Sequence, residues 1–148
     1  MTEQIARTRI SDLTALIARV VVGVVFIAHG LPKATDLEGT AGGFEAMGIP
    51  FPQFAALLGA GIEVGAGAAL IVGFALPIAG VLLALMMGNA YFFAHVGDPL
   101  VGGFELLLVL AAAALALGFS GGRFAVDSVL PWGRRRVRSE GKTAVHAA

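Results

Sequence analysis

Four long apolar runs divide this 148-residue chain, and they constrain its fold more than any other feature. They extend from about Leu13 to Leu31, Phe54 to Phe74, Pro77 to His95 and Leu100 to Phe119. A helix needs about 20 apolar residues to cross the hydrocarbon core of a bilayer, and each run is near that length. A helix also satisfies its own backbone hydrogen bonds in lipid. The sequence therefore predicts an all-α integral membrane four-helix bundle with four transmembrane helices.

The composition agrees with a membrane protein and excludes several kinds of chemistry. Hydrophobic residues make up 57% of the chain and charged residues 14%, whereas soluble domains carry about 25% charge. No cysteine is present, which excludes disulfides, thiol relays and cysteine-held haem or iron–sulfur groups within the chain. The formal net charge is zero, and we expect no nucleic-acid partner.

The basic residues predict the orientation of the bundle. Arg7 and Arg9 precede the first run, and four arginines follow the fourth: Arg134, Arg135, Arg136 and Arg138. The long loop at residues 32–52 carries one lysine against three acidic residues. Because Lys and Arg concentrate on the cytoplasmic side, we expect both termini to be cytoplasmic. The expected parts are a tail at residues 1–12, a transmembrane domain at 13–130 and a basic tail at 131–148.

The first run has a second interpretation, as a cleaved signal peptide whose basic start is Arg7 and Arg9. No small-x-small cleavage site follows "VVFIA". Cleavage would also leave three spans and place the arginine-rich tail on the opposite side of the membrane. The four-span interpretation is therefore favoured.

Polar residues interrupt the first two spans. Five residues at helical spacing share one face, four in the first span and the last just beyond Pro32: Arg19, Gly23, Phe26, Gly30 and Lys33. We expect this first span to stop at Pro32. The glycines on the shared face allow a second helix to approach closely.

The second span carries Glu63 on a face with Gly59 and Gly67. At 1.5 Å per residue from the outer helix ends, Arg19 and Glu63 both lie roughly 16–18 Å deep. An unpaired charge at that depth costs at least about 2.5–3.5 kcal/mol, so we predict that the two form a buried pair. The pair is either a clamp that fixes helix neighbours, or part of a polar pocket or proton route. Snorkelling to the membrane surface is a third alternative, more for Arg19 than for Glu63.

His29, His95 and Glu105 stand near the expected outer ends of their spans. Two histidines and a carboxylate are the ligand set of an open metal site, and two histidines can hold a haem. The three residues form no local motif, and residues at span ends commonly meet water and headgroups. We therefore favour ordinary interfacial hydrogen bonding and expect no metal.

Asn89 and the aromatic residues at 91–93 lie in the third span. An amide at this depth is an interhelical hydrogen-bonding group more often than a ligand contact. The aromatic residues form an interfacial belt, or they flank a flat apolar ligand such as a quinone ring.

These polar and small residues suggest an outward-opening, mostly apolar pocket with Glu63 at its floor. Gly23 and Gly30 leave room against the glycine-rich second span, and the region of Phe92 closes the space. Ordinary helix packing is the alternative. The candidate pocket residues are His29, Lys33, Asn89, Phe92, His95 and Glu105, beside the polar core of Arg19 and Glu63.

The chain resembles the DoxX family of small bacterial membrane proteins. The resemblance runs from about Ala18 to Asp127 and rests on the order and spacing of several motifs. These are Arg19 with Gly23, "HGLPKA", "FEAMGIPFP", Glu63 in "GIEVGAGAALIVG", and "GFSGGRFAVD". The family motif falls on Arg19, Gly30, Lys33 and Glu63 of this sequence.

The resemblance implies a four-helix bundle in the bacterial inner membrane, associated with redox chemistry. We expect a subunit of a membrane oxidoreductase system that contacts quinone, with membrane lipids, other redox subunits and further copies of itself as partners. No other cofactor is implied. Two alternatives stay open: a small transport or permeation protein that uses Glu63 as its ion or proton site, and a membrane scaffold without catalysis. Whether the chain itself catalyses a reaction is left open.

Overall fold

The computed structural model describes residues 2–120 and 122–130, with side chains from residue 9 onward. The main helices are α1 (Thr2–Thr35), α2 (Leu37–Ala46), α3 (Pro52–Val72), α4 (Leu76–Ala90) and α5 (Glu105–Phe119). Shorter elements are the π-helix η1 (Tyr91–His95), the kinked turn η2 (Leu100–Phe104), in which Val101 and Gly102 are not helical, and the 3-10 helix η3 (Val126–Ser128). Four segments are long and apolar enough to cross a membrane: Arg9–Thr35, Pro52–Val72, Leu76–His95 and Leu100–Phe119. The predicted α-helical membrane bundle is confirmed.

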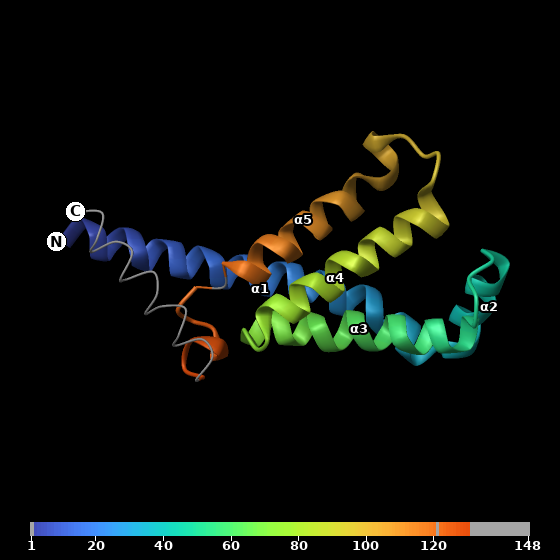
Figure 1. Ribbon diagram of the computed structural model, residues 1–148, viewed down its shortest axis with the longest axis horizontal. Helices are drawn as coiled ribbons and strands as arrows, with labels where there is room; N and C mark the ends of the chain where they lie inside the picture. Colours follow the sequence, from blue (N-terminus) through green and yellow to red (C-terminus); the bar gives the residue numbers. More distant parts are fainter. Residues whose placement is uncertain (1, 121, 131–148) are drawn as a thin grey trace.

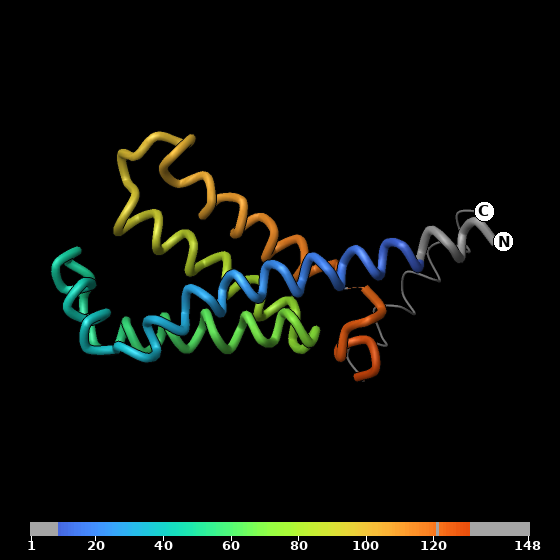
Figure 2. The backbone as a smooth tube through the Cα atoms, turned by 180° about the vertical axis from the view of Figure 1, so that it is seen from behind, coloured from blue at the N-terminus to red at the C-terminus, as the bar shows by residue number. Residues whose placement is uncertain are grey.

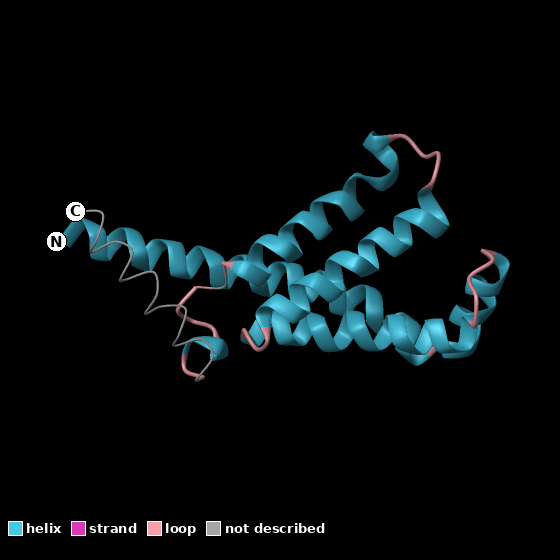
Figure 3. Cartoon of the chain, viewed as in Figure 1, coloured by secondary structure: helices cyan, strands magenta, loops and turns pink. Residues whose placement is uncertain are grey.

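The helices form two antiparallel pairs. Helix α1 packs along α3, and α4 packs along α5, while α3 and α4 join the pairs. The two pairs diverge toward the end that holds α2 and the α4–α5 connection, which we call the loop end (Figure 1). The opposite end, called the terminal end, holds the α3–α4 turn and residues 122–130, and α1 runs past the α3–α4 turn there (Figure 2). Within the described residues, loops and turns lie in the connections between helices and just after η3 (Figure 3).

Glycines set the distance between the paired helices. A Cβ atom on Gly23 would lie 2.7 Å from the carbonyl oxygen of Gly67, and one on Gly80 would lie 2.9 Å from the Cα atom of Gly118. Such contacts admit no side chain, so the backbones of α1 and α3, and of α4 and α5, approach closely. Phe26, Leu70 and Leu83 fill the space between the pairs as fully buried core residues.

One predicted boundary was wrong, and one helix was missed. Helix α1 does not stop at Pro32 but continues to Thr35, since Pro32 removes only its own N–H donor and its carbonyl still accepts a hydrogen bond of 3.1 Å from the Asp36 N–H. The segment expected as a long loop contains α2, a helix that the sequence analysis did not predict. The Asp36 carboxylate caps α2 by accepting a hydrogen bond of 2.9 Å from the Gly39 N–H.

At the terminal end, Asp127 holds the α3–α4 turn in place. Its carboxylate accepts hydrogen bonds from the backbone N–H groups of Ala75 and Leu76, at 2.9 and 2.8 Å, and so caps the start of α4. The Asp127 N–H donates to the carbonyl of Gly73, which ends α3 with a φ of 78°. The chain after α5 therefore fastens the α3–α4 hairpin.

Candidate functional site

An ion pair joins Lys33 of α1 to Glu63 of α3. The Lys33 Nζ donates to both carboxylate oxygens of Glu63 at 2.6 Å. The Glu63 side chain is 3% exposed and that of Lys33 29% exposed. Gly30 makes the pair possible, since a Cβ there would lie 2.8 Å from the Glu63 Cβ and push the helices apart. The charge of Glu63 is thus balanced within the α1–α3 interface.

Arg19 does not pair with Glu63, so that prediction was wrong. The glycine contacts place Gly30 opposite Glu63, and Arg19 lies three turns away beside Gly73. The depth count assumed that both helices reach the same outer level. Beyond the Gly30–Glu63 contact, α1 continues only to Thr35 whereas α3 begins at Pro52, so α3 extends past α1 at the loop end, where it packs against α2. This offset brings Lys33, not Arg19, to Glu63.

Arg19 is nevertheless buried, with 0% of the residue exposed. Its Nη2 donates to the Phe124 carbonyl at 2.9 Å, and the Asp127 carboxylate attracts its charge. Its Nε and Nη1 have no hydrogen-bond partner among the described residues. A Cβ on Gly73 would clash with Nη1. Arg19 therefore connects α1, the α3–α4 turn and the segment after α5 at the terminal end.

A cavity of about 380 Å³ opens beside the Lys33–Glu63 pair at the loop end. We call it the loop-end cavity. Its polar lining residues are Lys33, Glu63 and Asn89. The remaining walls come from α2, the α2–α3 turn, α3 and the α4–η1 face. They are formed by Phe44, Met47, Ile49, Pro50, Ala55, Leu58, Gly59, Met86, Ala90, Phe93 and Ala94. The cavity is thus apolar apart from one ion pair and one amide.

The structure places Asn89 in this cavity but not Phe92. Phe92 is 68% exposed and does not line the cavity, whereas its neighbour Phe93 does. The two rings contact edge to face with centroids 5.4 Å apart. Sequence reasoning also missed Phe44 and Met47, because it did not recognise α2. Their three-residue spacing, characteristic of one helical face, was the available signal.

His29, His95 and Glu105 do not come together, and none of them lines the loop-end cavity. The His29 Nδ1 donates to the Val25 carbonyl at 2.8 Å, and the His95 Nδ1 donates to Asp98 at 2.8 Å. Glu105 is exposed in the first turn of α5. Within residues 9–120 and 122–130, no group of three or more His, Cys, Asp or Glu side chains is placed to hold a metal ion.

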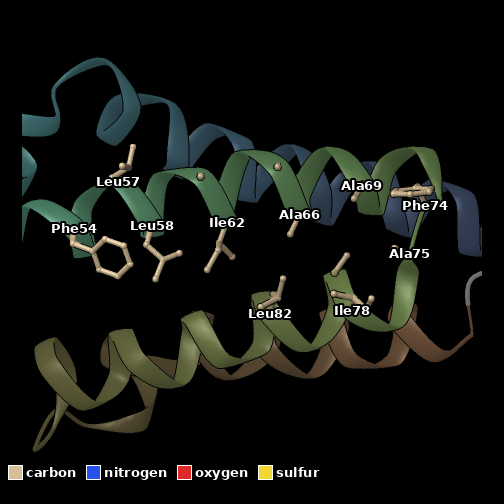
Figure 4. Close-up of a pocket in the computed structure, with 13 residues that line it drawn as sticks. Phe54, Leu57, Leu58, Ile62, Ala66, Ala69, Phe74, Ala75, Ile78 and Leu82 are labelled. Carbon is tan, nitrogen blue, oxygen red and sulfur yellow. The ribbon is translucent and has the colours of Figure 1, made fainter.

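A second cavity of about 550 Å³ lies between α3 and α4 and has no polar side chain in its lining. Leu58 and Ile62 of α3 point toward Ile78 and Leu82 of α4 across this groove (Figure 4). A wholly apolar groove offers no group that would orient a ligand. The loop-end cavity is therefore the better candidate for a specific binding site.

Comparison with known proteins gives a family and several relatives. The DoxX family model matches residues 14–96, more than half of the chain. A Bacillus subtilis protein named "Putative oxidoreductase CatD" is 34% identical over 113 residues, covering 76% of this chain and 83% of that protein.

Two further relatives come from other bacteria. The Escherichia coli "Inner membrane protein YphA" is 33% identical over 84 residues, 56% of this chain and 60% of its own length. A Haemophilus influenzae protein named only as uncharacterized is 36% identical over 119 residues, 74% of this chain and 85% of its own. No solved structure matches the chain significantly.

Proposed function

Because this chain belongs to the DoxX family of multi-pass inner-membrane proteins, we propose that it serves a membrane redox system by binding a quinone-like ligand. The proposed site is the loop-end cavity. The observation that carries the proposal is the Lys33–Glu63 ion pair in a cavity whose other walls are apolar except for the Asn89 amide. The name of the Bacillus subtilis relative, an oxidoreductase, supports the same class of chemistry.

The size and lining of the cavity suit a small amphipathic ring. Ligand pockets have volumes of about 300–1,000 Å³, with mostly apolar walls and a few polar groups that orient the ligand. The volume of about 380 Å³ is at the lower end of this range. Phe44 and Phe93 supply aromatic surface. An isoprenoid or alkyl tail would extend from the cavity into the surrounding lipid.

The charges of the cavity favour a neutral ligand. Lys33 and Glu63 balance each other, so a charged ligand would add an uncompensated charge to a site of low dielectric. An ammonium group has three N–H donors and no acceptor. Since the Lys33 side chain remains partly exposed, it can donate to a ligand carbonyl while it holds Glu63. A quinone offers such a carbonyl.

The packing beneath Glu63 favours ligand binding over permeation. A permeation route needs polar access from both sides of the membrane. On the terminal-end side of Glu63, the interior is filled by Phe26, Leu70 and Leu83. Proton or ion movement from Glu63 to the terminal end would have to cross this apolar core.

The absence of cysteine defines what the chain would need from partners. It has no thiol of its own to exchange electrons with a disulfide. We therefore propose that it acts with other redox subunits, supplying the membrane site for the quinone while a second protein supplies the electron donor or acceptor.

Binding of a short-tailed benzoquinone to the purified protein in detergent tests this function. The variant Lys33→Met/Glu63→Met removes both charges together, so that no charge is left unpaired, and we expect it to lose about 10-fold in affinity. Glu105→Gln changes an exposed carboxylate outside the cavity and is expected to bind as the wild type does. Equal affinity of the double variant and the wild type would show that the loop-end cavity is not the site.

A further inference from the structure

Asn89 has an unused amide in the loop-end cavity. Its side chain is exposed, lines the cavity and makes no hydrogen bond with any residue that the structure describes. A primary amide has two N–H donors and one acceptor oxygen. In a membrane bundle such a group ordinarily bonds to a neighbouring helix. No described residue uses the hydrogen-bonding capacity of Asn89, so it is available to a group that enters the cavity.

The amide and the ion pair stand at different levels of the cavity. A Cβ on Gly59 of α3 would lie 3.5 Å from the Met86 Cε of α4, so these two residues face each other across the helix interface. Asn89 lies three residues from Met86 toward the loop end, and Glu63 lies four residues from Gly59 the other way. Because the helices are antiparallel, the two displacements add to about 10 Å along the axis. A ligand that contacts both groups therefore meets them at different levels of the cavity.

We propose that Asn89 is a specificity-determining residue, which hydrogen-bonds a second oxygen on the ligand edge opposite the oxygen that faces Lys33. This inference rests on the proposed function and narrows its ligand class to neutral rings with oxygens on opposite edges. The ring between the two polar groups packs against the apolar wall that includes Leu58 and Phe93. A ring with one oxygen satisfies Lys33 and leaves Asn89 unpaired.

Two ligands with the same alkyl tail test this inference. One is a 1,4-naphthoquinone, and the other is the matching ring with a single ketone. We expect the wild type to bind the dione about 3- to 10-fold more tightly, the range that one net hydrogen bond gives. Asn89→Leu should lose this preference and still bind the monoketone with wild-type affinity.

The controls separate folding, ligand binding and self-association. The thermal midpoint of Asn89→Leu should stay near that of the wild type, since the amide bonds to no described residue of the bundle. If Asn89→Leu does not fold, the binding measurements are repeated with Asn89→Ala. An unchanged preference for the dione in both variants overturns the role of Asn89. An unchanged preference with an altered oligomeric mass shows that a second copy, not a ligand, uses the amide. If the wild type binds neither ring, the proposed function itself fails, and the role of Asn89 with it.

Discussion

At the scale of single residues, Lys33 and Glu63 differ in what each would lose without the other. Glu63 is almost fully buried, whereas Lys33 keeps part of its side chain exposed at the end of α1. A long lysine side chain can carry its charge to the membrane surface, but a buried glutamate has no such route. The pair is therefore asymmetric: Glu63 depends on Lys33 more than Lys33 depends on Glu63.

This asymmetry predicts that the two single substitutions of a double-mutant cycle destabilise the bundle by different amounts. Lys33→Met should destabilise the bundle by about 3 kcal/mol, because it leaves a buried carboxylate unpaired. Glu63→Met should cost less, and the double variant less than the sum of the two. Reversible unfolding of the purified protein in detergent measures these free energies. Strictly additive effects would mean that the two side chains do not interact.

At the scale of elements, two carboxylates cap helix starts in different settings. Asp127 caps α4 from a segment more than 50 residues later in the chain and lies beside the buried Arg19. Asp36 caps α2 from the adjacent residue and is exposed. The first cap is a tertiary contact that fastens the terminal end, and the second is local.

Hydrogen exchange distinguishes these two caps. Asp127→Ala should destabilise the bundle by about 1–2 kcal/mol and speed exchange both at the start of α4 and in residues 122–130, because it breaks two capping bonds between them. Asp36→Ala is the matched control and should speed exchange only in the first turn of α2. Faster exchange confined to α4 after Asp127→Ala would show that the two segments are not coupled through this cap.

At the scale of the whole molecule, the two ends of the bundle contain different features. The terminal end carries the buried Arg19, the Asp127 cap and the starting part of α1 (Figure 1). The loop end carries the cavity, α2 and the divergence of the helix pairs. A membrane-borne ligand reaches the loop-end cavity from the leaflet nearest that end. With the expected orientation, this is the outer leaflet.

Reporter fusions test that orientation. The basic residues predict that both termini are cytoplasmic, so green fluorescent protein joined to either end should fluoresce and alkaline phosphatase there should be inactive. Phosphatase inserted after Gly97, in the α4–α5 connection, is the positive control and should be active. An active phosphatase at both termini would place the cavity in the inner leaflet instead.

The sequence by itself determined the membrane helices, because about 20 apolar residues in lipid have little alternative to a helix. It also singled out Glu63, Lys33 and Asn89, since polar groups in such segments are rare. Only the tertiary structure decided which of them meet. Glycine contacts set the axial offset between α1 and α3. Because of that offset, Glu63 forms an ion pair with Lys33, and Arg19 instead hydrogen-bonds the segment after α5. Helix α2 was not predicted because it is short and crosses no membrane, so hydropathy gives no signal for it. Its position depends on packing against α3.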